Sequence, residues 1–177
     1  MIRPVTTRPL LAALALAWLG AACATTQAGS AASPLLGKPL DASAPDLQGR
    51  EVRLLAGGQV QVVDFWATWC DPCRAQFPVL DLLSAAYAEK GLTVTGISVD
   101  EDLAQVQAFA AANPVRFRLL WDKGGGRLAE RLDLQRLPTT LVLDRAGLVR
   151  FVHVGFQAEH ADRLAAEVTQ LLAEPAP

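Results

Sequence analysis

A mostly apolar run passes directly into two closely spaced cysteines near the middle of the chain. The run covers residues 60–66, and Trp69-Cys70-Asp71-Pro72-Cys73 follows it after two residues. An apolar run of this length that ends in a turn is typical of a buried strand, and a proline is tolerated in the first turn of a helix. The sequence therefore predicts a buried strand followed by a helix over 71–90, with Gly91 as its C-cap.

The spacing of the cysteines indicates reactive chemistry at two of the three. A structural disulfide stabilises chiefly by closing a long loop, whereas Cys70 and Cys73 would close a minimal one. The thiolate is the nucleophile in disulfide exchange, and the N-terminus of a helix stabilises negative charge. We therefore predict that Cys70 attacks a substrate disulfide and Cys73 resolves it. The cysteine pair is the redox centre, so we expect no separate cofactor and no metal.

The first 22 residues have the features of an export signal. Arg3 and Arg8 precede an apolar run over 10–19, which is about half the ~20 residues that a transmembrane helix needs. The residues that end at Cys23 resemble a bacterial lipoprotein box. We predict a signal peptide over 1–22, lipidation of Cys23 and a periplasmic or cell-envelope location with a lipid anchor. Ordinary signal cleavage and an uncleaved anchor remain open.

Composition and periodicity predict one α/β domain behind a tether. Residues 23–38 are rich in small and polar side chains, as in flexible linkers, and 39–177 form the domain. Its expected elements are a hairpin over 39–55, strands over 60–66, 92–99 and 117–121, helices over 71–90, 102–112 and 123–132, a second hairpin of 139–144 and 149–154, and a helix over 158–172. Strands that alternate with helices pair in parallel, and a closing hairpin adds antiparallel strands. This order predicts a mixed central sheet with helices on both faces.

The distribution of charge excludes one class of partner. The chain has 16 Lys and Arg against 18 Asp and Glu, and it contains no basic run or stripe. Binding to nucleic acid is therefore not expected.

The segment from Val63 to Cys73 resembles the thioredoxin superfamily. The chain is most similar to the TlpA/ResA group of envelope proteins, in which W-C-x-P-C is followed by a proline five residues on, here Pro78. That group also has an extra strand and helix, here residues 92–113. The resemblance implies a thioredoxin-like fold, protein thiols and disulfides as substrates and a membrane electron donor, with cytochrome c maturation as one setting.

The resemblance also implies roles for particular residues. Leu137-Pro138 matches a cis-proline loop that faces the cysteines, in which the residue before the proline binds an extended substrate through its backbone. Trp69 and Pro72 extend that substrate surface. Asp64 matches the buried acid of thioredoxin, whose desolvation raises its pKa so that it can take the Cys73 proton.

One position departs from the TlpA/ResA pattern. That group commonly has a glutamate three residues past the second cysteine, where this chain has Gln76. Gln76 cannot ionise, so any acid near the site must be Asp64.

The residues leave alternative functions open. Asp71 should oppose a thiolate at Cys70, and a less stabilised thiolate makes a less oxidising couple, which favours a reductant. A thioredoxin-fold copper chaperone would pair the cysteines with a distant histidine such as His160, although such proteins use a C-x-x-x-C spacing. A thiol peroxidase would need an arginine such as Arg74 beside its reactive cysteine.

Overall fold

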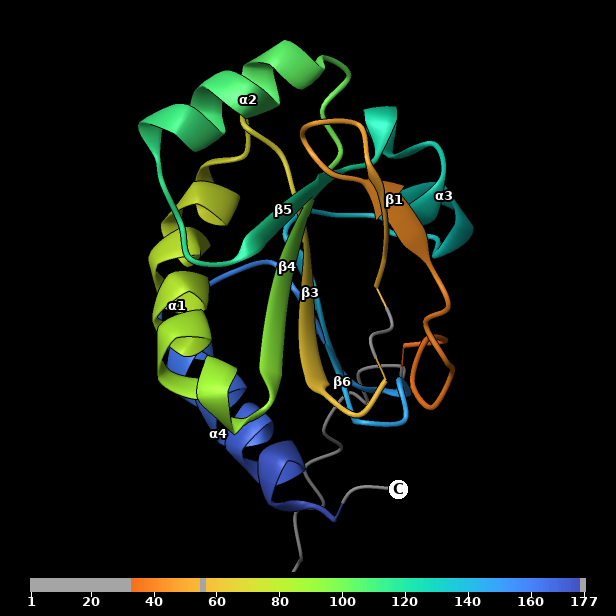
Figure 1. Ribbon diagram of the computed structural model, residues 1–177, viewed down its shortest axis with the longest axis vertical. Helices are drawn as coiled ribbons and strands as arrows, with labels where there is room; N and C mark the ends of the chain where they lie inside the picture. The colour runs from red at the N-terminus through yellow and green to blue at the C-terminus, as the bar shows by residue number, and fades with distance from the viewer. Residues whose placement is uncertain (1–32, 55–56, 176–177) are drawn as a thin grey trace, which may run out of the picture. The chain divides into compact units, whose positions relative to one another are not determined.

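Figure 1 shows the computed structural model, which describes residues 33–54 and 57–175. The predicted signal peptide over 1–22 and the predicted lipidation site Cys23 lie outside the described residues. Within the described ranges, none of the helices combines the length and apolar character needed to cross a membrane.

A five-stranded mixed sheet forms the centre of the domain, in the order β5-β4-β3-β6-β7 (Figure 1). Its strands are β3 (Val60–Trp66), β4 (Leu92–Ser98), β5 (Arg118–Trp121), β6 (Thr139–Leu143) and β7 (Val149–Val154). The pairs β3–β4 and β4–β5 are parallel, whereas β3–β6 and β6–β7 are antiparallel. The predicted mixed sheet is confirmed, and the closing hairpin is its antiparallel part.

Helices cover both faces of this sheet, as predicted. They are α1 (Asp71–Tyr87), α2 (Leu103–Ala112), α3 (Leu128–Arg131) and α4 (His160–Ala173), with short 3-10 helices η1 (Ala88–Lys90) and η2 (Lys123–Gly125). Side chains of α1, α2 and α4 join one hydrophobic cluster, and those of α3 join another. In Figure 1, α1 and α4 lie on one side of the sheet and α3 lies on the other with β1.

Strand β3 contributes to both clusters because successive side chains of a strand point to opposite faces. Val62 and Trp66 belong to the cluster of α1 and α4, and Val63 and Phe65 belong to the other. All seven residues of β3 are buried, which includes the charged residue Asp64. The same alternation places Asp64 on the face that α1 covers, beneath the helix that carries the cysteines.

The first helix ends earlier than predicted. The α-helical part stops at Tyr87, and η1 continues to Lys90. Gly91 follows with a φ of 94°, a left-handed conformation that a glycine adopts without a Cβ penalty. The predicted end of the helical segment is therefore correct, and its last turn is tightened into the 3-10 form that is common at helix ends.

The N-terminal hairpin is present as β1 (Ser43–Pro45) and β2 (Glu51–Arg53). The final part of the predicted tether, however, lies against the domain. The Gly37 N–H donates to the Val149 carbonyl at 2.8 Å, and the Val149 N–H donates to the Lys38 carbonyl at 3.0 Å. The folded part therefore begins before residue 39, because these backbone groups pair with the start of β7.

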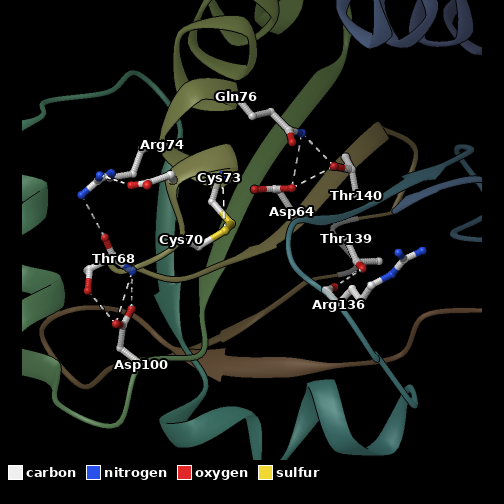
Figure 2. The surroundings of a disulfide bond; sticks show 11 residues. Asp64, Thr68, Cys70, Cys73, Arg74, Gln76, Asp100, Arg136, Thr139 and Thr140 are labelled. Atoms are coloured by element: carbon white, nitrogen blue, oxygen red, sulfur yellow. Dashed lines mark hydrogen bonds and ion pairs between the residues drawn. A yellow bond between two sulfur atoms is a disulfide. The ribbon is translucent and has the colours of Figure 1, made fainter. Parts of the chain in front are cut away.

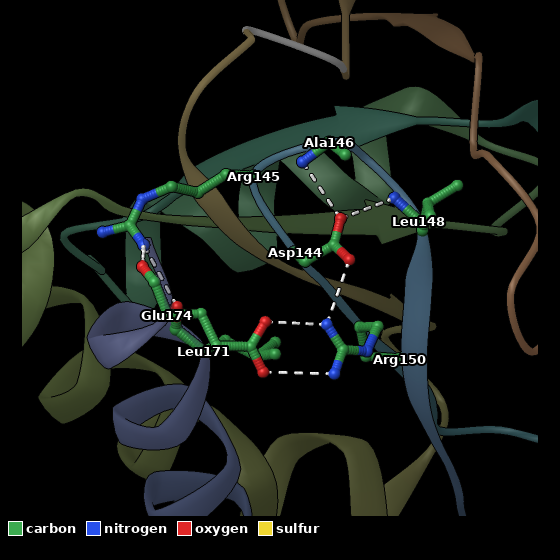
Figure 3. A network of polar contacts seen from close by, with 7 residues as sticks. All are labelled: Asp144, Arg145, Ala146, Leu148, Arg150, Leu171 and Glu174. Carbon is green, nitrogen blue, oxygen red and sulfur yellow. Dashed lines mark hydrogen bonds and ion pairs between the residues drawn. The ribbon is translucent and has the colours of Figure 1, made fainter. Parts of the chain in front are cut away.

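The turn between β6 and β7 is tied to the end of α4 (Figure 3). The Arg145 guanidinium donates to the carbonyls of Leu171 at 3.1 Å, Leu172 at 3.1 Å and Glu174 at 2.6 Å. The last carbonyls of a helix lack the usual partners within the helix. Arg145 therefore supplies donors at this helix end, where the Leu171 carbonyl also accepts from the Glu174 N–H at 3.3 Å. Arg150 pairs with the Glu174 side chain at 2.8 Å.

Candidate active site

The two cysteines lie where the chain passes from β3 into α1, and they form a disulfide (Figure 2). Cys70 is the N-cap residue of α1, and its N–H donates to the Ala67 carbonyl at 3.1 Å. Cys73 lies in the first turn and is 0% exposed, whereas Cys70 is 6% exposed. The structure thus brings together the predicted pair, with Cys70 as the more accessible residue.

The N-terminus of α1 provides a favourable place for negative charge on Cys70. The Cys73 N–H donates to Cys70 Sγ, with 3.3 Å between nitrogen and sulfur. Pro72 occupies the first turn, where its missing N–H removes no intrahelical bond. Free N–H groups and the helix dipole act in the same direction. We therefore expect this helix end to stabilise a thiolate at Cys70 in the reduced protein.

The negative charge of Asp71 beside Cys70 is accompanied by the positive charge of an arginine. Asp71 forms an ion pair with Arg74, one turn further along α1. The Arg74 guanidinium also donates to the Thr68 carbonyl at 3.5 Å. The guanidinium charge offsets part of the repulsion that Asp71 exerts on a neighbouring thiolate, which the sequence analysis did not include.

Asp64 lies beside this first turn with its carboxyl group completely buried. Desolvation raises the pKa of Asp64 to about 7, and the hydrogen bond from Thr140 opposes only part of that rise. Asp64 Oδ1 accepts from Thr140 Oγ1 at 2.8 Å and from Gln76 Nε2 at 3.4 Å. Asp64 Oδ2 has no hydrogen-bond partner among the described residues, and Figure 2 shows it pointing toward the disulfide.

Gln76 belongs to the same buried group. Its Nε2 donates to Thr140 Oγ1 at 2.8 Å, and Thr140 lies on β6 directly opposite Asp64 of β3. The sequence analysis noted Gln76 only as a departure from a family pattern and assigned no role to Thr140. No local signal identifies Thr140, because its contact with Asp64 depends on the register of two strands far apart in the chain.

The predicted cis-proline is present, since the Leu137–Pro138 peptide bond is cis. Pro138 itself is buried. Trp69, in contrast, is 67% exposed, which fits the predicted role in a substrate surface better than a role in the core.

A groove of about 760 Å³ opens beside Cys70. Trp69 and Pro72 line it on the side of the redox helix, and Leu137 lines it on the side of the cis-proline loop. The predicted substrate-binding residues therefore share one surface with Cys70, apart from the buried Pro138.

The groove also exposes glycines of the segment predicted as a helix over 123–132, which the structure divides into η2 and α3. Gly124 and Gly125 line it and have φ values of 58° and 70°, a region that favours glycine. A Cβ atom on Gly124 would collide with the carboxyl group of Glu101. Glycine at this position therefore leaves room for the Glu101 carboxyl group.

Asp100 is a further residue of the site that sequence reasoning missed. It follows the buried strand β4 and is 2% exposed. Its carboxylate accepts from the Thr68 N–H at 3.0 Å, from the Thr68 hydroxyl at 2.7 Å and from the Ser98 hydroxyl at 2.7 Å. An aspartate at the carboxyl end of a buried strand was the available signal, since buried charges require partners.

His153 lies on β7 directly opposite Thr140, but among the described residues neither histidine forms a hydrogen bond with the cysteines or with Asp64. His153 Nε2 is 2.6 Å from Glu167 Oε2, and His160 accepts from the Gln157 N–H at 3.3 Å. In the described part of the chain, no group of three or more His, Cys, Asp or Glu side chains is placed to hold a metal ion. The position of His160 therefore gives no support to the copper-handling alternative.

Residues 27–169 match the family described as Redoxin. The chain is 36% identical over 119 residues to the thioredoxin-like protein YneN of Bacillus subtilis (strain 168), which covers 65% of this chain and 68% of that protein. It is 33% identical over 150 residues to the thiol:disulfide interchange protein DsbE of Pseudomonas fluorescens biotype C, with 82% of both covered. It is 31% identical to the thiol-disulfide oxidoreductase ResA of Bacillus thuringiensis subsp. konkukian (strain 97-27), over 60% of that protein's length.

Solved structures give the same result for the fold. A candidate thiol:disulfide interchange protein DsbE from Chlorobium tepidum superimposes with a TM-score of 0.72 at 31% identity, covering 77% of this chain and 96% of that one. The predicted α/β fold with its mixed sheet and N-terminal hairpin is thereby confirmed. The chain belongs to the Redoxin family, as a thioredoxin-fold enzyme related to the ResA and DsbE thiol–disulfide oxidoreductases.

Proposed function

We propose that this protein reduces disulfides in other proteins of the cell envelope through Cys70 and Cys73. The observation that carries the proposal is the unequal environment of the two sulfurs. Cys70 receives an N–H at the helix N-terminus and borders an open groove, whereas Cys73 is fully buried one turn away. An attacking thiolate needs stabilisation and access, and a resolving thiol needs only proximity to the first sulfur.

The reaction then follows two exchanges. The Cys70 thiolate attacks one sulfur of the substrate disulfide, so that a Cys70–substrate bond forms and the other substrate sulfur leaves as a thiolate. Cys73 gives its proton to Asp64 and attacks Cys70 Sγ, which releases the second substrate sulfur and forms the Cys70–Cys73 disulfide present in this structure. Two electrons pass to the substrate.

The charges around the pair favour the reducing direction. Asp71 beside Cys70 opposes thiolate formation there, although Arg74 offsets part of this effect. A less stabilised thiolate makes a less oxidising couple. Equilibration with glutathione tests the direction, because a potential near about −120 mV, typical of strong oxidants, would contradict it.

We also propose that the protein is anchored at the membrane of the cell envelope and receives electrons from a membrane donor. An oxidising compartment would convert the pair to the disulfide, so a membrane donor must return electrons to it. The export signal over 1–22 and lipidation of Cys23 would hold the protein at the membrane, and cytochrome c maturation is one setting for such a reductant. If Cys23 is lipidated, Cys23→Ala will move the protein from the membrane fraction to the soluble fraction.

A trapping experiment tests the proposal directly. Cys73→Ser in the full chain should retain its substrates as mixed disulfides through Cys70, and mass spectrometry of the captured complexes identifies them. Cys70→Ser is the matched control and should capture nothing. If Cys70→Ser captures substrates and Cys73→Ser does not, then Cys73 is the attacking cysteine and Cys70 the resolving one. If neither variant captures a protein, protein disulfides are not the substrates.

A further inference from the structure

Two neighbouring side chains hold the Asp64 carboxyl group, and their effect on the reaction rests on the proposed role of Asp64 as proton acceptor. A buried carboxyl group can exchange a proton with a sulfur atom only if one of its oxygens faces that sulfur and is free to accept. What fixes the two oxygens of Asp64 therefore matters for the resolving step.

The surroundings of Asp64 give it few polar neighbours. On β4 the residue opposite Asp64 is Gly96, which has no side chain. On β6 the opposite residue is Thr140, and Gln76 reaches the same place from α1. Among the described residues, Thr140 and Gln76 supply all the hydrogen bonds that Asp64 receives on its side chain.

The hydrogen bonds in this group have a fixed direction. An amide nitrogen can only donate, so Gln76 Nε2 makes Thr140 Oγ1 an acceptor. The single hydroxyl hydrogen of Thr140 is then available for Asp64 Oδ1, 2.8 Å away. Both donors thus act on the same carboxyl oxygen, and Oδ2 receives none. Figure 2 shows this division, with Oδ1 toward Gln76 and Thr140 and Oδ2 toward the sulfurs.

We propose that Thr140 and Gln76 are positioning residues that hold Asp64 by Oδ1 and thereby assign proton transfer with Cys73 to Oδ2. In the resolving step the Cys73 S–H bond breaks, its proton forms a bond to Asp64 Oδ2, and the sulfur electron pair attacks Cys70 Sγ. The substrate sulfur leaves with the electrons of the broken disulfide bond. Thr140 and Gln76 exchange no proton in this step.

The hydroxyl of Thr140 has a second consequence that can be measured. A donor to a carboxylate favours the charged form, so the Thr140 hydroxyl lowers the pKa of Asp64 from the value that burial alone would give. Without this hydroxyl, a larger fraction of Asp64 is protonated at neutral pH and fewer molecules can accept the Cys73 proton.

The test uses the reduced protein and Ellman's reagent. Cys70 attacks the reagent and releases one thionitrobenzoate, and Cys73 then releases the second, so the second phase in a stopped-flow experiment reports the resolving step. Thr140→Val keeps the size of the side chain and removes the hydroxyl. We expect the pH midpoint of the second phase to rise by about one unit, and its rate at pH 7 to fall about fivefold.

Three other variants make the result specific. Thr140→Ser retains the hydroxyl and should keep the wild-type midpoint. Gln76→Met removes the donor that orients Thr140, so its midpoint should shift in the same direction as in Thr140→Val. Thr139→Val is the matched control, because the buried Thr139 hydroxyl donates to the Arg136 carbonyl and not to Asp64, and its midpoint should not move.

Two outcomes separate this inference from the proposed function. If Thr140→Val keeps the wild-type midpoint while Asp64→Asn abolishes the pH dependence, Asp64 is the acceptor but Thr140 does not position it. If Asp64→Asn also keeps the wild-type profile, the proposed role of Asp64 fails and the inference fails with it. A ¹³C NMR titration of the Asp64 carboxyl in each reduced variant checks the same shifts without a substrate.

Discussion

Asp100 accepts hydrogen bonds from both the backbone N–H and the hydroxyl of Thr68, two residues before Cys70. Its backbone carbonyl also accepts from Trp121 Nε1 at 2.7 Å. The turn that leads into the redox helix is therefore fastened to the carboxyl end of β4 by one buried side chain. Because Cys70 follows this turn directly, the same contacts fix where the Cys70 sulfur lies.

Replacing Asp100 should therefore affect both stability and reactivity. Asp100→Ala leaves the Thr68 N–H without its acceptor, and we expect the free energy of unfolding to fall by about 2 kcal/mol. The alkylation rate of reduced Cys70 should fall as well, because the turn loses its fixed geometry. Urea unfolding and iodoacetamide kinetics measure the two effects. Asp102→Asn is the control, since Asp102 caps α2 at the surface and asparagine caps equally well.

The buried Asp64 predicts an unusual dependence of stability on pH. The pKa of Asp64 is about 7 in the folded protein and near 3.8 in the unfolded chain, so between these values the folded state binds more protons. The Asp64 contribution to the free energy of unfolding should therefore fall as pH rises from about 4 to about 7, by on the order of 4 kcal/mol at most. Urea unfolding of the oxidised protein at several pH values should show this slope, and Asp64→Asn should lack it. Equal slopes in the two proteins would contradict the burial-induced shift.

Trp69 should contribute to binding of protein substrates and not to folding. Its side chain is 67% exposed beside the groove, so Trp69→Ala should leave the midpoint of urea unfolding unchanged. Reduction of a disulfide-bonded protein substrate should slow through a higher KM, whereas reaction with Ellman's reagent should not. Leu82→Ala is the matched control, because Leu82 is 65% exposed on α1 but does not line the groove. A similar loss in both variants would exclude a specific contact at Trp69.

Arg145 should stabilise the end of α4. Its guanidinium donates to the carbonyls of Leu171 and Glu174 (Figure 3) and to that of Leu172, so Arg145→Ala should lower the free energy of unfolding by about 1–2 kcal/mol. Hydrogen exchange should become faster in the last turn of α4 and remain unchanged in α1. Arg163→Ala is the comparison on the same helix, because Arg163 is 69% exposed and contacts Glu167 at 3.6 Å. Its effect on unfolding should be negligible.

Local patterns in the sequence identified the elements and the reactive pair. These patterns depend only on residues that are close together in the sequence. They are the apolar run of β3, the proline after Cys70 and the glycine at the end of the first helix. Boundaries were less accurate, as at Tyr87 and at residues 33–38, because the last turn of a helix and the start of a domain depend on neighbouring backbone groups.

The sequence by itself determined the order of strands and helices, the junction that carries Cys70 and Cys73, and the presence of an acid in a buried strand. Only the tertiary structure decided what surrounds them. Thr140 reaches Asp64 across 76 positions of sequence, and Asp100 reaches Thr68 across 32. Hydrogen bonds depend on distance and angle, and the register of paired strands sets these only after the sheet has formed.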